Sequence, residues 1–194
     1  MYFKSKQDHL ELTATMFYDD LVERCKKGDT RSYETLYQQY SKAMYNTSLR
    51  IVNNASDAED VLQEAFMDAF RFLGDFNYKS TFGAWLKRIV INKSINVLRK
   101  RKADFIDIET TTVADNTPNE EVLDEENIQL KVAEVKKAVT LLPNGYRTVL
   151  TLYLFEGYDH EEIAEIMRIS ESTVRTQYHR AKHKLLHIIN QGLS

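Results

Sequence analysis

The sequence of 194 residues contains one cysteine, Cys25, which excludes an internal disulfide and argues against a zinc site built on cysteines. Six glycines and two prolines leave few turn-forming residues, and this scarcity favours long helices over a sheet of many strands. No stretch approaches the roughly 20 apolar residues that a membrane-spanning helix needs. The first residues lack an apolar core, which predicts that they are not a signal peptide. These absences favour an all-α protein in a reducing cytoplasm.

Charge is sorted along the chain, although the net charge is only -3. Residues 79–102 contain lysines and arginines but no acid, and residues 103–130 contain acids but no base. Residues 168–187 are basic again, with Glu171 as their single acid. Two basic segments separated by an acidic one predict a polyanionic partner that is contacted at two places. The alternative is that each basic run is a solvated helix face.

Hydrophobic periodicity predicts two helical bundles joined by a flexible acidic linker. The first bundle spans 16–102, with helices over 16–27, 31–52, 56–73 and about 81–102. Residues 103–125 form the linker, because they are acidic, contain Pro118 and show no sustained period. The second bundle spans 126–190, with helices over 126–142, 143–157, 160–167 and 171–190, where Pro143 lies in a first helical turn that tolerates it. Thr30, Ser56, Asp159 and either Ser80 or Thr81 are the expected N-terminal caps.

The last two of these helices have the pattern of a helix-turn-helix. Ile163, Ala164 and Met167 are expected to pack inward, while Ile169 and Val174 fill the corner. The turn lacks glycine, so Arg168 or its neighbour has to adopt a strained conformation. The alternative is a plain antiparallel pair of helices.

In a helix-turn-helix the N-terminal half of the second helix points into the major groove. The side chains expected to reach base edges there are Ser172, Arg175, Thr176 and His179. Arg175 could bind a guanine through both arms of its guanidinium group. Phosphate contacts are expected from Arg180, Lys182 and Lys184.

The basic helix near 81–102 begins in a cluster of aromatic residues: Phe76, Tyr78, Phe82 and Trp85. Cations and amides follow along it: Lys87, Arg88, Asn92, Lys93, Asn96 and Arg99. Aromatic rings stack on unpaired bases and cations hold the backbone, so this composition predicts binding of single-stranded nucleic acid. The alternative is that Phe82 and Trp85 belong to the core, and Trp85 fits a core position best.

Four acids fall on one side of the helix over 56–73: Asp57, Asp60, Glu64 and Asp68. We call this set the acidic ridge. Like charges in a row repel each other, so something is expected to compensate them, and a basic protein partner would do so. The alternative is a solvated acidic face.

Catalytic patterns are missing from the sequence: it contains no glycine-rich phosphate loop and no nucleophile elbow. His179, His183 and His187 share one helix face and could hold a metal ion, but no acid or cysteine accompanies them. We therefore predict no catalytic residue, no metal site and no cofactor.

Taken together, these residues resemble a bacterial RNA polymerase sigma factor of the extracytoplasmic-function group, within the sigma-70 family. The resemblance covers about residues 20–190. In the first bundle it is carried by Tyr33-Glu34-Thr35-Leu36-Tyr37, Asp57–Phe66 and Phe82–Ile89, which look like region 2. In the second bundle it is carried by Leu142-Pro143, Arg147, Glu156–Tyr158, Glu162–Ala164 and Thr173–Arg175, which look like region 4.

The resemblance implies three binding surfaces. A polymerase-core surface would dock on the coiled coil of the largest polymerase subunit through Asp57, Asp60, Gln63 and Glu64. The loop from Phe76 to Thr81 would capture a flipped base, so the −10 surface would comprise Phe76, Asn77, Tyr78, Lys79, Ser80, Lys87, Arg88, Asn92 and Asn96. The −35 element would be bound by Ser172, Thr173, Arg175, Thr176, His179, Arg180 and Lys184.

The implied function is to direct RNA polymerase core to promoters and to assist promoter opening, without catalysis by this chain. An anti-sigma factor would control it, and the linker would run through the RNA channel. The expected location is the cytoplasm, at the nucleoid when active or near the inner membrane when held by an anti-sigma factor. The resemblance also implies a two-domain form without region 3 or a long N-terminal inhibitory segment. The alternative functions are a dimeric helix-turn-helix regulator that binds DNA unaided and a helical metal- or nucleotide-dependent enzyme.

Overall fold

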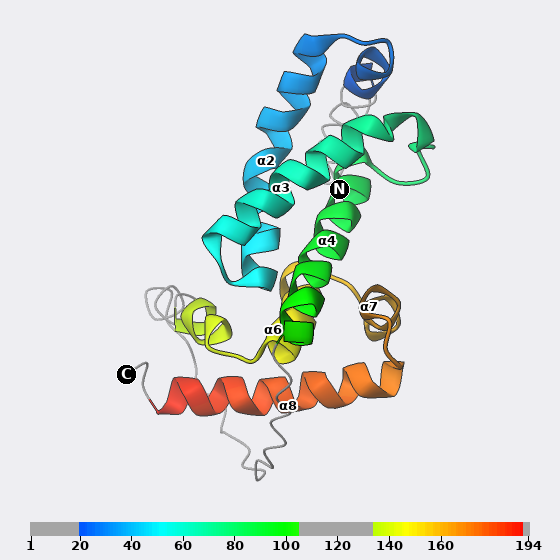
Figure 1. The fold of residues 1–194 in the computed structure, drawn as a ribbon. Helices are drawn as coiled ribbons and strands as arrows, with labels where there is room; N and C mark the ends of the chain where they lie inside the picture. Colours follow the sequence, from blue (N-terminus) through cyan, green and yellow to red (C-terminus); the bar gives the residue numbers. More distant parts are fainter. Residues whose placement is uncertain (1–19, 105–133, 192–194) are drawn as a thin grey trace, which may run out of the picture. The chain divides into compact units, whose positions relative to one another are not determined.

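The computed structural model describes residues 20–104 and 134–191 (Figure 1). These residues form helices joined by turns and contain no strand, in agreement with the predicted all-α class. They fall into two compact units, one made of residues 20–49 and 54–96, the other of residues 50–53, 97–104 and 134–191. Every helix in these ranges is too short or too polar to cross a bilayer. Most of the predicted linker, 105–125, lies outside the described residues, as do 16–19 and 126–133. The prediction is wrong for its first two residues, 103 and 104, which continue the helix that ends at Asp104.

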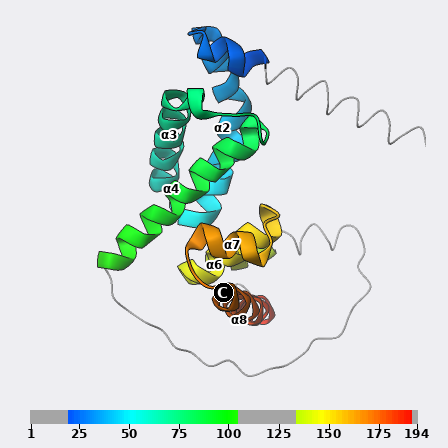
Figure 2. The ribbon, with the colours of Figure 1, turned by 90° about the vertical axis from the view of Figure 1, so that its right-hand side faces the viewer.

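The first unit is built on three long helices that lie side by side (Figures 1 and 2). Residues 20–26 form a short helix before them. The long helices are α2 (Thr30–Val52), α3 (Ala55–Arg71) and α4 (Phe82–Asp104). The first unit includes α2 up to Leu49 and α4 up to Asn96. A single 3-10 turn, η1 (Leu73–Asp75), follows α3 and leads into the loop before α4.

Two of the predicted caps of these helices are wrong by one or two residues. The Asp29 carboxylate accepts hydrogen bonds from the Arg31 amide and from the Ser32 hydroxyl, so Asp29 and not Thr30 caps α2. Asn54 caps α3 by accepting from the Asp57 amide, which places Ser56 inside the first turn. Asn and Asp are as effective at this position as Ser and Thr, so local propensity could not choose between neighbours. The Thr81 hydroxyl accepts from the Ala84 amide, which confirms one of the two caps proposed for α4.

The core of the first unit contains the apolar stripe predicted for α3: Ala58, Val61, Leu62, Ala65, Phe66 and Ala69 are all buried. The ring of Tyr37 on α2 lies 4.8 Å from that of Phe66. One turn further along α2, Tyr40 packs against Phe82, with 5.5 Å between ring centroids. A Cβ atom at Gly83 would lie 2.7 Å from Tyr40 Cε1, so glycine is what lets α4 start this close to α2.

The second unit packs shorter helices against one long one. Residues 134–140 are helical, followed by α6 (Asn144–Leu150), η2 (Thr151–Phe155), α7 (His160–Met167) and α8 (Glu171–Asn190). The core of this unit comprises Ala138, Val139, Leu142, Leu150, Ala181 and Leu185. The sequence predicts one helix over 143–157, but Pro143 is the N-cap residue and α6 begins at Asn144. The second half of the predicted helix, η2, is a π-helix that the pattern did not reveal. Gly157, at φ +79°, ends it in the left-handed region.

Candidate functional site

The predicted polymerase-core surface lies on the solvent side of α3. Asp60, Gln63 and Glu64 are exposed, and Asp57 is partly exposed. They are held there because the opposite side of the helix carries the buried apolar stripe. Asp60, Gln63 and Glu64 are therefore accessible together to a partner that approaches α3 from solvent, whereas Asp57 is only partly accessible.

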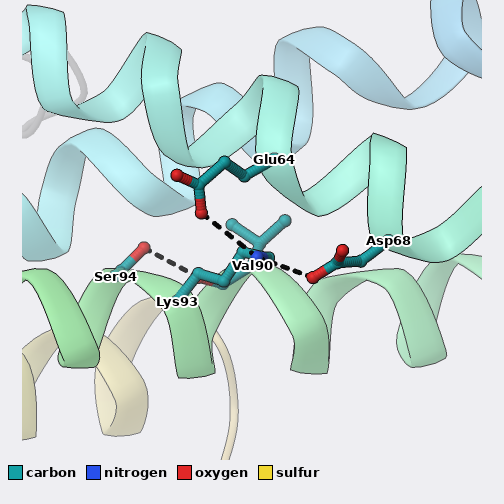
Figure 3. A network of polar contacts seen from close by, with 5 residues as sticks. All are labelled: Glu64, Asp68, Val90, Lys93 and Ser94. Carbon is teal, nitrogen blue, oxygen red and sulfur yellow. Dashed lines mark hydrogen bonds and ion pairs between the residues drawn. The ribbon is translucent and has the colours of Figure 1, made fainter.

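One lysine of α4 contacts the acidic ridge (Figure 3). Lys93 Nζ lies 2.6 Å from Asp68 Oδ2 and 3.2 Å from Glu64 Oε2. Burial lowers the pKa of Lys93, but its hydrogen bonds to Asp68 and Glu64 outweigh that effect and raise the pKa above its ordinary value. Lys93 thus supplies from within the chain part of the compensation that the sequence assigned to a partner. Its ammonium group points to the ridge, whereas the sequence predicted a contact with nucleic acid.

Two large apolar side chains near the ridge are exposed, and sequence reasoning missed both. Met67 on α3 is 63 % exposed, and Phe72, at the end of the same helix, is 50 % exposed. Exposed large apolar side chains that sit together with charges are typical of protein-binding surfaces. The signal was available, because Met67 interrupts the helical spacing of the buried stripe.

The loop of residues 76–81 presents polar side chains above a buried aromatic ring. Phe76 is only 3 % exposed, and its ring packs 5.3 Å from Trp85 and 6.0 Å from Phe82. Phe76 therefore supports the loop from below in this conformation. The remaining predicted residues of the loop, Asn77, Tyr78, Lys79 and Ser80, are exposed.

Helix α4 continues this surface. Arg88, Asn92 and Asn96 follow each other at intervals of four residues, which places them on one face of the helix. Asn92 and Asn96 are exposed, whereas Arg88 is partly exposed and so is Lys87 beside it. Trp85 is half-buried and Phe82 is buried, so the core alternative holds fully for Phe82 and in part for Trp85.

The helix-turn-helix is present in the second unit as α7, a three-residue turn and α8. Asp159 and Glu162 form the reciprocal capping box that starts α7. Ile163, Ala164 and Val174 are buried as predicted. The expectation for Met167 is wrong, because Ile166 is buried and Met167 lies partly exposed in the last turn of α7. Both positions fit helical spacing, so periodicity alone could not separate them.

Arg168 makes the turn, as the missing glycine predicts. Its backbone is left-handed, with φ 53° and ψ 48°, and it ends α7. The amide of Ile169 donates to Ala164 O at 3.1 Å and so closes the turn. The Ser170 hydroxyl then accepts from the Thr173 amide and begins α8.

The side of α8 that the sequence assigns to the −35 element is open to solvent. Ser172, Thr173, Arg175, Thr176, His179 and Arg180 are exposed, and Lys184 is partly exposed. The Thr176 hydroxyl donates to Ser172 O at 2.9 Å. Arg175 is paired with Glu171, one turn earlier, through Nη2 and Oε1 at 2.6 Å. The side chains assigned to the −35 element are therefore accessible together, and the Arg175 guanidinium group is paired with Glu171.

An aromatic cluster behind α8 was not predicted. The rings of Tyr153 in η2 and His160 in α7 are stacked, with 5.0 Å between their centroids. The centroid of the Tyr178 ring on α8 lies 4.6 Å from that of Tyr153 and 5.2 Å from that of His160. The cluster ties three elements together and sets the direction of α8. Its members are too far apart in the sequence for spacing to reveal it.

The histidine face of α8 shows a close pair. His179 Nε2 and His183 Nε2 lie 3.2 Å apart. In the described residues, no group of three or more His, Cys, Asp or Glu side chains is arranged to hold a metal ion.

Comparison with known families matches both halves of the chain. The family described as Sigma-70 region 2 matches residues 36–103, and the family described as Sigma-70, region 4 matches residues 133–185. The RNA polymerase sigma-H factor of Pseudomonas aeruginosa is 36% identical over 177 residues, covering 85% of this chain and 90% of that protein. The ECF RNA polymerase sigma-E factor of Escherichia coli is 33% identical over 173 residues, covering 85% of this chain and 90% of that protein. The ECF RNA polymerase sigma factor SigW of Bacillus subtilis is 31% identical over 172 residues, covering 84% of this chain and 92% of that protein.

Two solved structures share the fold. CnrH, in complex with the cytosolic domain of CnrY, has a TM-score of 0.54 at 24% identity and covers 89% of this chain and 96% of that chain. The sigma factor RpoE of Bartonella quintana, in complex with the anti-sigma factor NepR, has a TM-score of 0.54 at 23% identity, covering 83% and 98%.

Proposed function

The chain belongs to the extracytoplasmic-function sigma factors of the sigma-70 family, which direct RNA polymerase to promoters, and we propose that it does so through three surfaces. It is not an enzyme, because a sigma factor contributes promoter selection while the polymerase carries out the chemistry. The three surfaces are the solvent side of α3, the loop of 76–81 with α4, and the exposed side of α8.

The solvent side of α3 binds the polymerase core. The support is the exposure of Asp60, Gln63 and Glu64 together with Met67. A basic helical partner would pair with the carboxylates and cover the methionine, and such mixed surfaces combine rapid association with buried apolar area. Because Lys93 already pairs with Glu64, Asp60 is the carboxylate that gains most from a partner.

The loop of 76–81 and the outer face of α4 bind the unpaired −10 strand. Asn77, Tyr78, Lys79 and Ser80 contact a flipped base, and Arg88, Asn92 and Asn96 follow the strand along α4. Phe76 contributes as the buried support of the loop, in place of the base contact expected from the sequence.

The exposed side of α8 reads the −35 duplex. Its N-terminal half carries Ser172, Arg175 and Thr176 towards base edges, while Arg180 and Lys184 are placed for phosphates. The observation that carries the proposal is this exposed polar face, which begins directly after the left-handed turn at Arg168.

An anti-sigma factor is the proposed regulator. The support is that CnrH and RpoE, which share the fold, were each solved with a partner, and that the partner of RpoE is the anti-sigma factor NepR. We place the chain in the cytoplasm, at the nucleoid when it is active and near the inner membrane when an anti-sigma factor holds it.

Run-off transcription tests the function directly. Purified polymerase core is supplied with a pool of random promoter DNA, with and without the chain, and the transcript start sites are sequenced. We expect a restricted set of start sites with shared −35 and −10 sequences only when the chain is present. A free-standing regulator would instead protect DNA in a footprint without polymerase and would leave the start sites of the core unchanged.

A further inference from the structure

The short helix over residues 20–26 contacts the loop of 76–81 through one lysine. Lys26 Nζ donates to Phe76 O at 3.1 Å. The same ammonium group lies 4.4 Å from the centroid of the Tyr78 ring and 5.9 Å from that of Phe76. An ammonium group at this distance over an aromatic face is attracted by the ring. Lys26 therefore holds both the backbone of the loop and its exposed aromatic side chain.

A second residue of the same helix holds the other end of Tyr78. The Tyr78 hydroxyl donates to Glu23 Oε1. That oxygen also lies 3.4 Å from Lys26 Nζ, so the carboxylate has a cation beside it. The hydrogen bond from Tyr78 lowers the pKa of Glu23, since it stabilises the ionised form. Tyr78 is thus fixed at its hydroxyl and at its ring face by two residues one turn apart.

The backbone of Tyr78 needs such support. Its φ is +59°, a left-handed conformation that is unusual for a bulky residue and persists only where neighbours hold it. On the loop side, the Phe76 ring packs 4.7 Å from the Tyr78 ring. Tyr78 nevertheless remains 39% exposed, so an aromatic ring on a strained backbone, held by its neighbours, is presented to solvent.

We propose that Lys26 and Glu23 are positioning residues that fix the Tyr78 ring in the orientation in which the loop receives an unpaired base of the −10 strand. The inference rests on the proposed function of the loop of 76–81. Stacking on a base depends on the direction of the ring, and a ring fixed in advance lowers the cost of ordering the complex. Both residues precede the segment 36–103 that matches region 2, so the family match does not assign them this role.

The test measures base preference in the complete holoenzyme. Purified core is loaded with each variant and allowed to select from fork-junction DNA whose unpaired −10 strand is randomised. Lys26→Met removes the charge and the donor but keeps the apolar stem. Lys27→Met is the matched control, because it removes the same charge from the next residue. Lys26→Arg tests rescue, and Tyr78→Ala tests the loop itself.

We expect Lys26→Met to reduce the base preference at one position of the strand by at least about threefold. Glu23→Ala is expected to act at the same position, because it releases the same ring. Lys26→Arg is expected to keep most of the preference, and Lys27→Met all of it. Core affinity of Lys26→Met is expected to match that of Lys27→Met, and its thermal midpoint to lie only about 2–4 °C lower because one hydrogen bond is lost, which separates positioning from a loss of fold.

The possible failures are distinguishable. If Tyr78→Ala changes no base preference, the function proposed for the loop is wrong. If Tyr78→Ala changes a preference while Lys26→Met behaves like Lys27→Met, the loop function stands and the positioning role is overturned. A uniform loss across all positions in Lys26→Met also overturns it, because it would identify Lys26 as a phosphate contact.

Discussion

Arg175 and Glu171 form a forked pair on the exposed side of α8, in which Nε and Nη2 of the arginine both donate to Oε1 of the glutamate, at 3.0 and 2.6 Å. Both side chains are largely exposed, so the pair contributes little to stability. Its effect is to limit the directions that the guanidinium group can take, which on the proposed function orients it before DNA binds.

This pair leads to a prediction about −35 recognition. Arg175→Ala is expected to reduce discrimination at one base pair by about 1–3 kcal/mol, because a bidentate base contact is lost. Binding to holoenzyme is measured on −35 duplexes substituted one base pair at a time. Arg180→Ala serves as the comparison and is expected to weaken binding to all sequences alike. An equal loss on every sequence for Arg175→Ala would make it a phosphate contact.

The acidic ridge gives a prediction about core binding. Asp60→Lys is expected to weaken the affinity for polymerase core by at least about tenfold, since an attraction becomes a repulsion. Fluorescence anisotropy with labelled chain measures this affinity. Glu165→Lys, an exposed residue of α7, makes the same charge change as a control. Unchanged affinity in Asp60→Lys would remove α3 from the docking surface.

Glu64→Lys is expected to behave differently from Asp60→Lys. It places a lysine beside Lys93 in place of the Glu64 carboxylate, which lies 3.2 Å from Lys93 Nζ. Partial exposure screens the repulsion, so a loss of about 0.5–1 kcal/mol in the free energy of unfolding is expected. Urea denaturation measures it, and Lys93→Met in the Glu64→Lys background is expected to recover part of the loss. Equal stability of Asp60→Lys and Glu64→Lys would contradict this.

The turn at Arg168 predicts a change in stability with a definite sign. Glycine adopts the left-handed backbone without strain, so Arg168→Gly is expected to stabilise the chain by about 0.5–1 kcal/mol. Arg168→Val, with a β-branched side chain at the same φ of 53°, is expected to destabilise it. Thermal unfolding of the two variants against Arg168→Ala isolates the backbone effect. The same midpoint for glycine and valine would show that the turn relaxes.

The burial of Cys25 predicts that its thiol is unreactive in the folded chain. Its side chain is fully buried, and burial, with a smaller contribution from Asp29, raises its pKa to about 11. At pH 8 about 0.1 % of such a thiol is ionised, and only the thiolate reacts. A chromogenic disulfide reagent is expected to react in urea but not with the folded chain. Fast labelling without urea would contradict the buried placement.

The same shift has a consequence for stability at high pH. Between the ordinary pKa of 9.0 and the folded value of about 11, the unfolded thiol ionises first. The unfolded state then binds fewer protons, so the free energy of unfolding falls as pH rises through this window. Cys25→Ala is expected to remove this contribution, which urea denaturation at pH 8 and pH 10 measures by difference.

Helix positions were predictable because their signals are local. The buried stripe of α3 and the capping box at Asp159 follow from residues within one or two turns of each other. The bounds of α8, Glu171–Asn190, were predicted from the same kind of pattern. Asn54 and Ser56 show the limit, since both are good caps and tertiary packing decides between them.

The candidate surfaces were predictable as sets of residues but not as contacts. That α3 is acidic and α4 basic is visible in the sequence, whereas the pairing of Lys93 with Glu64 and Asp68 depends on how the two helices pack. The burial of Phe76 depends in the same way on Trp85 and Phe82. Such contacts join residues far apart in the chain, and no local period encodes them.

The placement of Lys93 also changes how binding of the −10 strand is expected to depend on ionic strength. Each cation that neutralises a phosphate of single-stranded DNA releases counterions. Each such contact steepens the fall of log affinity with log salt concentration by about 0.7. Lys93 directs its charge to two carboxylates of α3, so α4 displaces fewer counterions than its lysines and arginines suggest. On the function proposed for α4, capture of the strand is expected to be less sensitive to salt concentration than the composition of α4 implies.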